Sequence, residues 1–187
     1  MRYIMRFFLR LMGWKVVGQL PEEQKKYVVI FAPHTSNWDF VLMLMVRFCF
    51  KMKVAYLGKH TLFKPPFGWF FRMFGGIPVE RSAAHNVVDM AANIIKERDE
   101  IQFALAPEGT RSKKPYWKSG FYHIALKAEV PILLAYMDSS KGVLGLGPLF
   151  YPTGVVEEDL EFLRDFYKDK PGIKPELASD IRFKERD

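Results

Sequence analysis

The chain has 187 residues, 49% of them hydrophobic, which is enough for one globular domain with a sizeable core. A single cysteine, Cys49, excludes a disulfide framework within the chain and fits a reducing, cytosolic environment. The net charge is +7, and residues 1–81 carry 13 basic against 4 acidic side chains. This asymmetry predicts an anionic partner, and the aromatic residues scattered through the apolar runs favour a membrane surface.

The sequence disfavours two classes of protein, those that bind nucleic acids and those that span a membrane or are exported. The basic residues follow no recognisable nucleic-acid-binding module, so we expect no nucleic-acid partner. No apolar run reaches the roughly 18 residues of a membrane-spanning helix, and Arg6 and Arg10 interrupt any signal-peptide core. We therefore expect a peripheral protein that neither spans a membrane nor is exported.

Residues 1–13 predict an amphipathic helix at a membrane interface. At about 100° per residue, Arg2, Arg6 and Arg10 fall on one narrow stripe with large apolar residues opposite. Anionic headgroups attract such a stripe by about 1 kcal/mol per basic residue. The alternative is a terminal helix that packs on the body with its arginines in water.

Strand and helix patterns alternate through residues 14–170, the expected catalytic core. This order predicts an α/β fold in which helices flank a mostly parallel central sheet. Residues 144–151 are punctuated by Gly and Pro and predict an edge strand followed by a loop, and residues 171–187 predict a charged surface tail. The expected strands are 14–17, 27–31, 54–58, 75–81, 101–106 and 130–137, and the expected helices are 40–46, 84–98, 118–128 and 157–168.

The first chemical motif is a histidine and an aspartate at a predicted strand-to-helix turn. His34 follows the apolar run 27–32, and Asp39 precedes the apolar helix 40–46. With Ser36 as the N-cap, Asp39 lies in the first helical turn and can reach back to the histidine. The alternative interpretation is a capped helix with a chance histidine beside it.

Such a pair has a definite chemistry. A carboxylate bonded to one imidazole nitrogen fixes the tautomer, and the other nitrogen can then accept a proton from a substrate hydroxyl. With Ser36 taken as the N-cap, His34 has no serine or cysteine as a nucleophilic partner, which favours direct attack by the substrate hydroxyl without an acyl-enzyme.

The second motif, residues 107–112, follows a predicted buried strand. Gly109 permits a positive φ, so that neighbouring amides can converge, and Arg111 adds a fork of donors. These features predict an anion cradle, although Glu-Gly-Thr also suits a plain turn. The remaining histidines have no Cys or His partners at zinc spacing, so we expect no metal site.

An aromatic segment lies between the two motifs. Residues 59–74 carry more Phe and Trp side chains than one helix face can bury. The segment therefore lines an apolar pocket, contacts lipid, or is an ordinary core element that begins at Pro65-Pro66.

Four ordered blocks together resemble the motifs of the glycerolipid acyltransferases, which include the 1-acylglycerol-3-phosphate acyltransferases. The resemblance covers about residues 18–137. The blocks are His34-x4-Asp39, Lys59…Gly68…Gly75…Arg81, Pro107-Glu108-Gly109-Thr110-Arg111-Ser112 and Val130-Pro131-Ile132.

The resemblance implies an O-acyltransferase that takes a fatty acyl group from acyl-CoA or acyl-carrier protein and needs no cofactor. His34 would be the general base and Asp39 would orient it. A lysophospholipid at the cytoplasmic face of the cell membrane would be the acceptor. The implied substrate-binding residues are Lys59, Arg81, Glu108, Gly109, Thr110 and Arg111.

The chain departs from the family pattern at Thr61, Pro78 and Ala106. Thr61 and Pro78 flank the acceptor side implied by the resemblance, so an acceptor with a non-glycerol or amino-acid headgroup remains an alternative. A non-catalytic peripheral lipid-binding protein is the alternative from another class.

Overall fold

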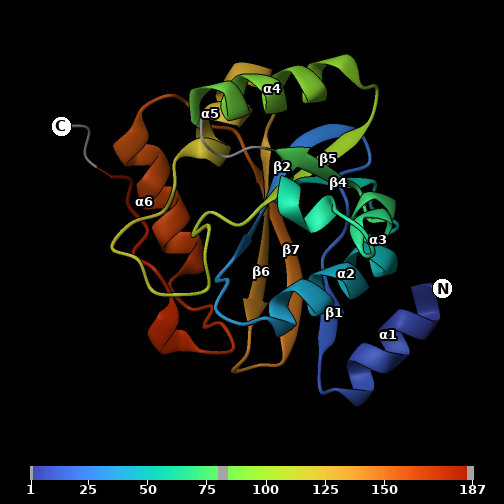
Figure 1. Cartoon of the computed structure of the whole chain (residues 1–187). Coiled ribbons are helices and arrows are strands. Elements are labelled where there is room, and N and C mark those ends of the chain that lie inside the picture. The colour runs from blue at the N-terminus through green and yellow to red at the C-terminus, as the bar shows by residue number, and fades with distance from the viewer. Residues whose placement is uncertain (1, 80–83, 185–187) are drawn as a thin grey trace.

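The computed structural model describes residues 2–79 and 84–184, and one seven-stranded sheet runs through them (Figure 1). Neighbouring strands follow the order β1-β7-β6-β2-β5-β3-β4. The five strands β2 to β6 are mutually parallel, β7 is antiparallel to β6, and β1 is parallel to β7. The mostly parallel α/β fold predicted from the sequence is thus confirmed. The strands are β1 Lys15–Val17, β2 Lys26–Ala32, β3 Val54–Lys59, β4 Gly76–Val79, β5 Ile101–Leu105, β6 Ile132–Asp138 and β7 Val143–Phe150.

Helices cover both faces of this sheet. Helices α4, α5 and α6 contribute to one core cluster, and α1 and α2 contribute to the other (Figure 1). The helices are α1 Arg2–Leu11, α2 Trp38–Phe50, α3 Gly68–Met73, α4 Ala84–Glu97, α5 Gly120–Ala128 and α6 Val156–Tyr167, with short 3₁₀ turns η1 His60–Phe63 and η2 Pro175–Leu177.

The central strand β2 explains the layering. Val28 and Ile30 belong to the cluster under α4, α5 and α6, whereas Val29 and Phe31 belong to the cluster under α1 and α2. Both faces of the strand are therefore apolar, and the sequence reads as a continuous apolar run, as expected for a parallel strand buried on both sides.

The strand β7 corrects the prediction of an edge strand at residues 144–151. It lies between β6 and β1, and the edges of the sheet are β1 and β4. Its glycines make room for rings: a Cβ at Gly145 would lie 2.2 Å from the ring of Tyr136, and one at Gly147 would lie 2.5 Å from the ring of Phe166. Glycines that suggest turns in the sequence serve close packing here.

The segment after α6, predicted as a charged surface tail, makes specific contacts with the body of the protein. Residues 171–184, which we call the C-terminal strap, return to the sheet, and Gly172 and Ser179 are buried. The main chain of Trp117 pairs with the strap at Phe183, whose ring packs against Phe121 and Tyr122. Residues 185–187 lie outside the described part of the chain.

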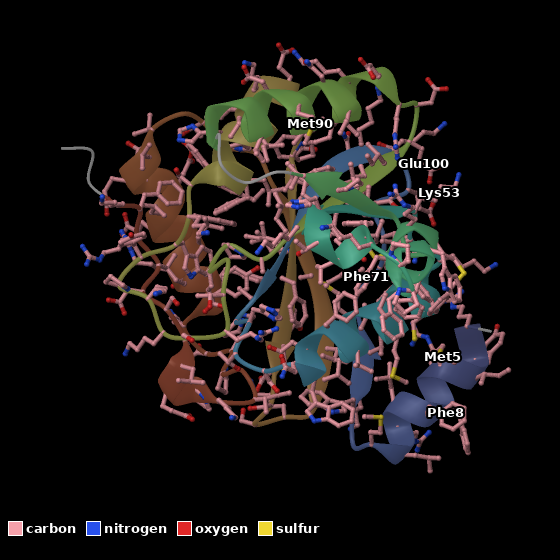
Figure 2. All side chains as sticks on the ribbon, in the orientation of Figure 1. Met5, Phe8, Lys53, Phe71, Met90 and Glu100 are labelled. Carbon is pink, nitrogen blue, oxygen red and sulfur yellow. The ribbon has the colours of Figure 1, made fainter. Side chains whose placement is uncertain are left out.

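The amphipathic helix predicted at the N-terminus forms α1, and its apolar residues divide between the body and the outer surface. Leu9 is buried against the body, whereas Phe7 and Leu11 are 59% and 67% exposed. Arg6 turns inward, where its guanidinium lies 5.5 Å from the centre of the Phe50 ring. Figure 2 labels Phe8 on the outward side of this helix. Within the described residues, no helix combines the length and apolar character needed to cross a bilayer.

The turn that follows β5 contains a residue in the left-handed region. Gly109 has φ +64°, and its amide donates to the carbonyl of Ala106 at 3.0 Å. A Cβ there would also lie 2.8 Å from the side-chain carbons of Lys118. Lysine is flexible enough to move, so the backbone conformation dominates the cost of adding a side chain.

Gly109→Ala is expected to destabilise the fold by about 1–2 kcal/mol, because a non-glycine residue in the left-handed region meets its own carbonyl. Urea unfolding followed by circular dichroism measures the change. Gly120→Ala is the matched control, since a Cβ at Gly120 meets nothing within 4 Å. Equal losses in both variants would contradict the explanation.

Candidate active site

The histidine–aspartate pair lies at the carboxyl end of β2, where the chain turns into α2. His34 Nδ1 is 3.1 Å from Asp39 Oδ2, and the two side chains are 18% and 0% exposed. With its Nδ1 proton directed to the carboxylate, the ring keeps a lone pair on Nε2. The geometry therefore suits a proton acceptor held in one tautomer.

The same carboxylate oxygen also organises the turn. Asp39 Oδ2 accepts hydrogen bonds from the backbone N–H groups of Thr35 at 2.7 Å and Ser36 at 2.8 Å. The hydroxyl of Ser36 accepts the N–H of Trp38 at 3.2 Å. Ser36 thus makes a capping hydrogen bond, although the helix boundary places Asn37 at the N-cap, one residue later than expected.

Glu108 lies beside the pair but is occupied by the main chain. Its Oε2 accepts the N–H of His34 at 2.5 Å, and its Oε1 accepts the N–H of Ser179 at 3.1 Å. The side chain is 2% exposed, and burial raises the pKa of its carboxyl group. Both carboxylate oxygens therefore hold backbone segments at the site.

The predicted anion cradle forms the neighbouring turn. Gly109 has its positive φ here, Thr110 Oγ1 accepts the N–H of Ser112 at 3.4 Å, and Arg111 is exposed. Lys118 was missed by the sequence analysis, although its main-chain N–H donates to the carbonyl of Pro107 at 2.8 Å and its side chain crosses Gly109. Only the fold could reveal it, because a lysine before a helix has no distinctive pattern.

Lys59 lies farther along the carboxyl end of the sheet. Lys59 ends β3, which is two strands from β2 and therefore roughly 10 Å away across the sheet. Arg81 lies outside the described residues. The structure thus brings His34, Asp39 and Glu108 together, and it places Lys59 at a distance that a second part of a substrate could span.

An apolar cavity of about 50 Å³ lies between α2 and the sheet. Phe31 and Phe40, which flank the motif at residues 34–39, line it, as does Arg47 roughly 10 Å farther along the helix. The Arg47 guanidinium lies over the Phe74 ring at 5.7 Å, and burial lowers the pKa of this group. The cavity therefore extends inward from the motif towards a partly buried cation.

Within the described residues, no group of three or more His, Cys, Asp or Glu side chains could hold a metal ion.

Curated relatives share a substantial part of the chain. The 1-acyl-sn-glycerol-3-phosphate acyltransferase of Haemophilus influenzae is 30% identical over 156 residues, which cover 76% of this chain and 63% of the relative. The enzyme of the same name from Escherichia coli is 28% identical over 157 residues, covering 79% and 62%. The chain thus matches less than two thirds of the length of these relatives.

The fold has a solved counterpart. The crystal structure of the 1-acyl-sn-glycerophosphate (LPA) acyltransferase PlsC from Thermotoga maritima aligns with a TM-score of 0.64 at 21% identity, covering 89% of this chain and 75% of that one. This similarity concerns the architecture of the sheet and its helices.

The sequence itself matches the family model described as Acyltransferase over residues 14–137, a span that contains both motifs and the strands that carry them. The resemblance drawn from the four ordered blocks is confirmed by this match. The chain belongs to the acyltransferase family.

Proposed function

We propose that this protein transfers a fatty acyl group from a thioester donor, acyl-CoA or acyl-carrier protein, to the hydroxyl of a lysophospholipid of the 1-acylglycerol-3-phosphate type. The observation that carries the proposal is the contact between His34 Nδ1 and the buried carboxylate of Asp39. A lipid-binding protein without turnover has no need for a histidine held in one tautomer beside a buried carboxylate.

The proposed reaction has two steps. His34 Nε2 accepts the proton of the acceptor hydroxyl while the hydroxyl oxygen forms a bond with the thioester carbonyl carbon. The tetrahedral intermediate then collapses, the carbon–sulfur bond breaks, and the thiolate takes the proton from His34. Asp39 remains ionised and stabilises the imidazolium between the steps.

Direct transfer is favoured over an acyl-enzyme by the hydroxyls beside His34. Thr35 Oγ1 accepts the N–H of Lys174 at 3.1 Å, and Ser36 Oγ accepts the N–H of Trp38. Both hydroxyls thus serve the backbone. The sole cysteine, Cys49, is buried near the far end of α2.

The acceptor phosphate is assigned to the turn after β5. Arg111 offers a planar fork of donors suited to phosphate oxygens, and Lys118 adds a second positive charge across Gly109. Lys59, at the end of β3, extends this basic edge. Arg81 is proposed as a phosphate ligand from the resemblance alone.

The acyl chain is assigned to the cavity under α2. Its volume of about 50 Å³ is well below the roughly 300 Å³ at which ligand pockets begin, so the lining must move to admit a chain. Met43 and Met52 line the cavity, and their unbranched side chains can repack around a ligand.

The membrane is assigned to the face formed by α1 and α3. Both elements contact α2. Arg6 of α1 lies over the ring of Phe50 in α2, and Phe74 at the end of α3 packs against Phe48 in α2. Their exposed apolar side chains are Tyr3, Ile4, Phe7, Phe8, Leu11 and Met12 near α1, and Leu62, Phe67, Trp69 and Met73 near α3. In this arrangement a peripheral enzyme at the cytoplasmic face collects its lysolipid from the leaflet while its acyl donor arrives from the cytosol.

The direct test is a panel of lysolipids, with glycerol and amino-acid headgroups, incubated with radiolabelled acyl-CoA and acyl-carrier protein. Acylated 1-acylglycerol-3-phosphate is the expected product. Fatty acid released without any acylated lipid would assign the protein to thioester hydrolysis. Lipid binding without either product would assign it to the non-catalytic class.

His34→Ala is expected to lower the transfer rate by about 10²–10⁴-fold, the usual contribution of a positioned base, and Asp39→Asn is expected to impair transfer as well. Initial rates together with circular dichroism separate lost catalysis from lost folding. Asp89→Asn is the control, because Asp89 forms an exposed ion pair with Lys127. Transfer near the wild-type rate in His34→Ala would rule out the proposed mechanism.

Arg111→Ala is expected to raise the acceptor KM about 10–100-fold, since a charge-assisted hydrogen bond contributes about 1.5–3 kcal/mol. The donor KM should stay near its original value. Arg98→Ala serves as the matched control, because Arg98 is exposed at the opposite end of the sheet. A raised donor KM with an unchanged acceptor KM would reassign the cradle to the phosphates of the donor.

The double variant Phe7→Ser/Leu11→Ser is expected to weaken binding to lipid vesicles by more than about tenfold, because each side chain contributes up to about 1.5–3 kcal/mol on leaving water. Co-sedimentation with anionic vesicles measures the change. Tyr151→Ser/Val155→Ser removes two exposed apolar side chains distant from α1 and should bind like wild type. Equal binding by both double variants would exclude α1 from the membrane contact.

A further inference from the structure

The C-terminal strap lies beyond the family match, which ends at residue 137, and yet it reaches the catalytic motif. The strap begins at the end of β6, where the N–H of Ser139 donates to the carbonyl of Pro171 at 2.9 Å and its hydroxyl donates to that of Gly172 at 2.7 Å. Gly172 is pressed against the motif, since a Cβ there would lie 2.8 Å from Thr35 Oγ1. The strap is thus fixed where β2 and β6 end.

Two hydrogen bonds connect the strap to the candidate active site, one to each of the two sequence motifs. The main-chain N–H of Lys174 donates to Thr35 Oγ1 at 3.1 Å, and that of Ser179 donates to Glu108 Oε1 at 3.1 Å. Both acceptors are buried, each with 2% exposure. Buried acceptors of this kind are normally hydrogen-bonded, and the strap supplies these donors.

Each of the two acceptor residues is one hydrogen bond away from the histidine–aspartate pair. The second oxygen of Glu108, Oε2, accepts the N–H of His34 at 2.5 Å. The N–H of Thr35 donates to Asp39 Oδ2, the oxygen that also contacts His34 Nδ1. The strap therefore supports both the backbone of the histidine and the carboxylate that orients its ring.

We propose that the C-terminal strap positions the catalytic histidine, with Thr35 and Glu108 as the positioning residues that link it to the pair. The proposal rests on the proposed function, in which His34 is the base. Under this proposal Glu108 does not bind phosphate but holds His34 in place. A displacement of about 1 Å in such a group can cost about 10²-fold in rate.

A strap with only a structural role would affect melting temperature and kcat differently. The strap has anchors away from the pair, among them Arg182, whose Nε donates to the carbonyl of Pro115 at 2.7 Å. If the strap served stability alone, loss of any anchor would lower the melting temperature and leave kcat unchanged at temperatures where the protein is folded.

The test compares Thr35→Val, Thr35→Ser and Arg182→Ala in the full chain. Valine keeps the shape of threonine but removes the acceptor of the Lys174 N–H, whereas serine keeps the hydroxyl. We expect Thr35→Val to lower kcat by about 10–10²-fold with both KM values near wild type, and Thr35→Ser to retain most of kcat. Arg182→Ala should lower the melting temperature and keep kcat. Glu108→Gln should behave like Thr35→Val.

A readout that does not need turnover keeps the proposal separate from the proposed function. The nitrogen-15 NMR shifts of the His34 imidazole report its tautomer. We expect the Nδ1-protonated form in wild type and Arg182→Ala, and a mixture of tautomers in Thr35→Val and Glu108→Gln.

The outcomes are distinct. If wild type acylates no lysolipid, the proposed function fails, and the NMR comparison still decides whether the strap positions the ring. Wild-type kcat and tautomer in Thr35→Val would overturn the proposal. Equal loss of kcat in Arg182→Ala and Thr35→Val would also overturn it, because the effect would then not depend on the contacts of Thr35 and Glu108 with the histidine–aspartate pair.

Discussion

One buried carboxylate oxygen holds the site together. Asp39 Oδ2 accepts the N–H groups of Thr35 and Ser36 and contacts His34 Nδ1, and the Asp39 side chain is fully buried. A buried charge is costly unless it is hydrogen-bonded, so these donors have to be supplied by the surrounding turn. The start of α2, the shape of the turn and the orientation of the imidazole are therefore set by a single requirement. A change to any of them disturbs the other two.

The parts that were predictable from the sequence are those with a local pattern. The run at residues 27–32 is apolar on both faces and defines a central parallel strand, and the spacing of His34 and Asp39 across a strand-to-helix turn brings their side chains together. Because the carboxyl ends of parallel strands lie at the same end of a sheet, the turns after β2 and β5 were both expected there, and their closeness follows from the pairing of the two strands.

The parts that were not predictable depend on contacts without a local pattern. The charged composition of residues 171–187 resembles that of a solvated tail, whereas the contacts of the strap to the motif are made by backbone N–H groups, which every residue except proline carries. In the same way, Gly145 and Gly147 resemble turn residues because the rings of Tyr136 and Phe166 that they accommodate come from other elements. The hydrogen bonds of Glu108 could not be predicted either, because its partners, His34 and Ser179, are distant in the chain.

The position of β1 at the edge of the sheet has a consequence for how the molecule is assembled. β1 lies near the N-terminus, but its partner is β7, with Lys15 opposite Val143. On a ribosome the partner emerges long after β1, and such a long-range pairing is slow because a large loop must close first. The outward apolar face of α1, which is joined directly to β1, is therefore present in the nascent chain before the sheet that supports it. The N-terminal segment is thus synthesised well before the strand that holds β1 in the sheet.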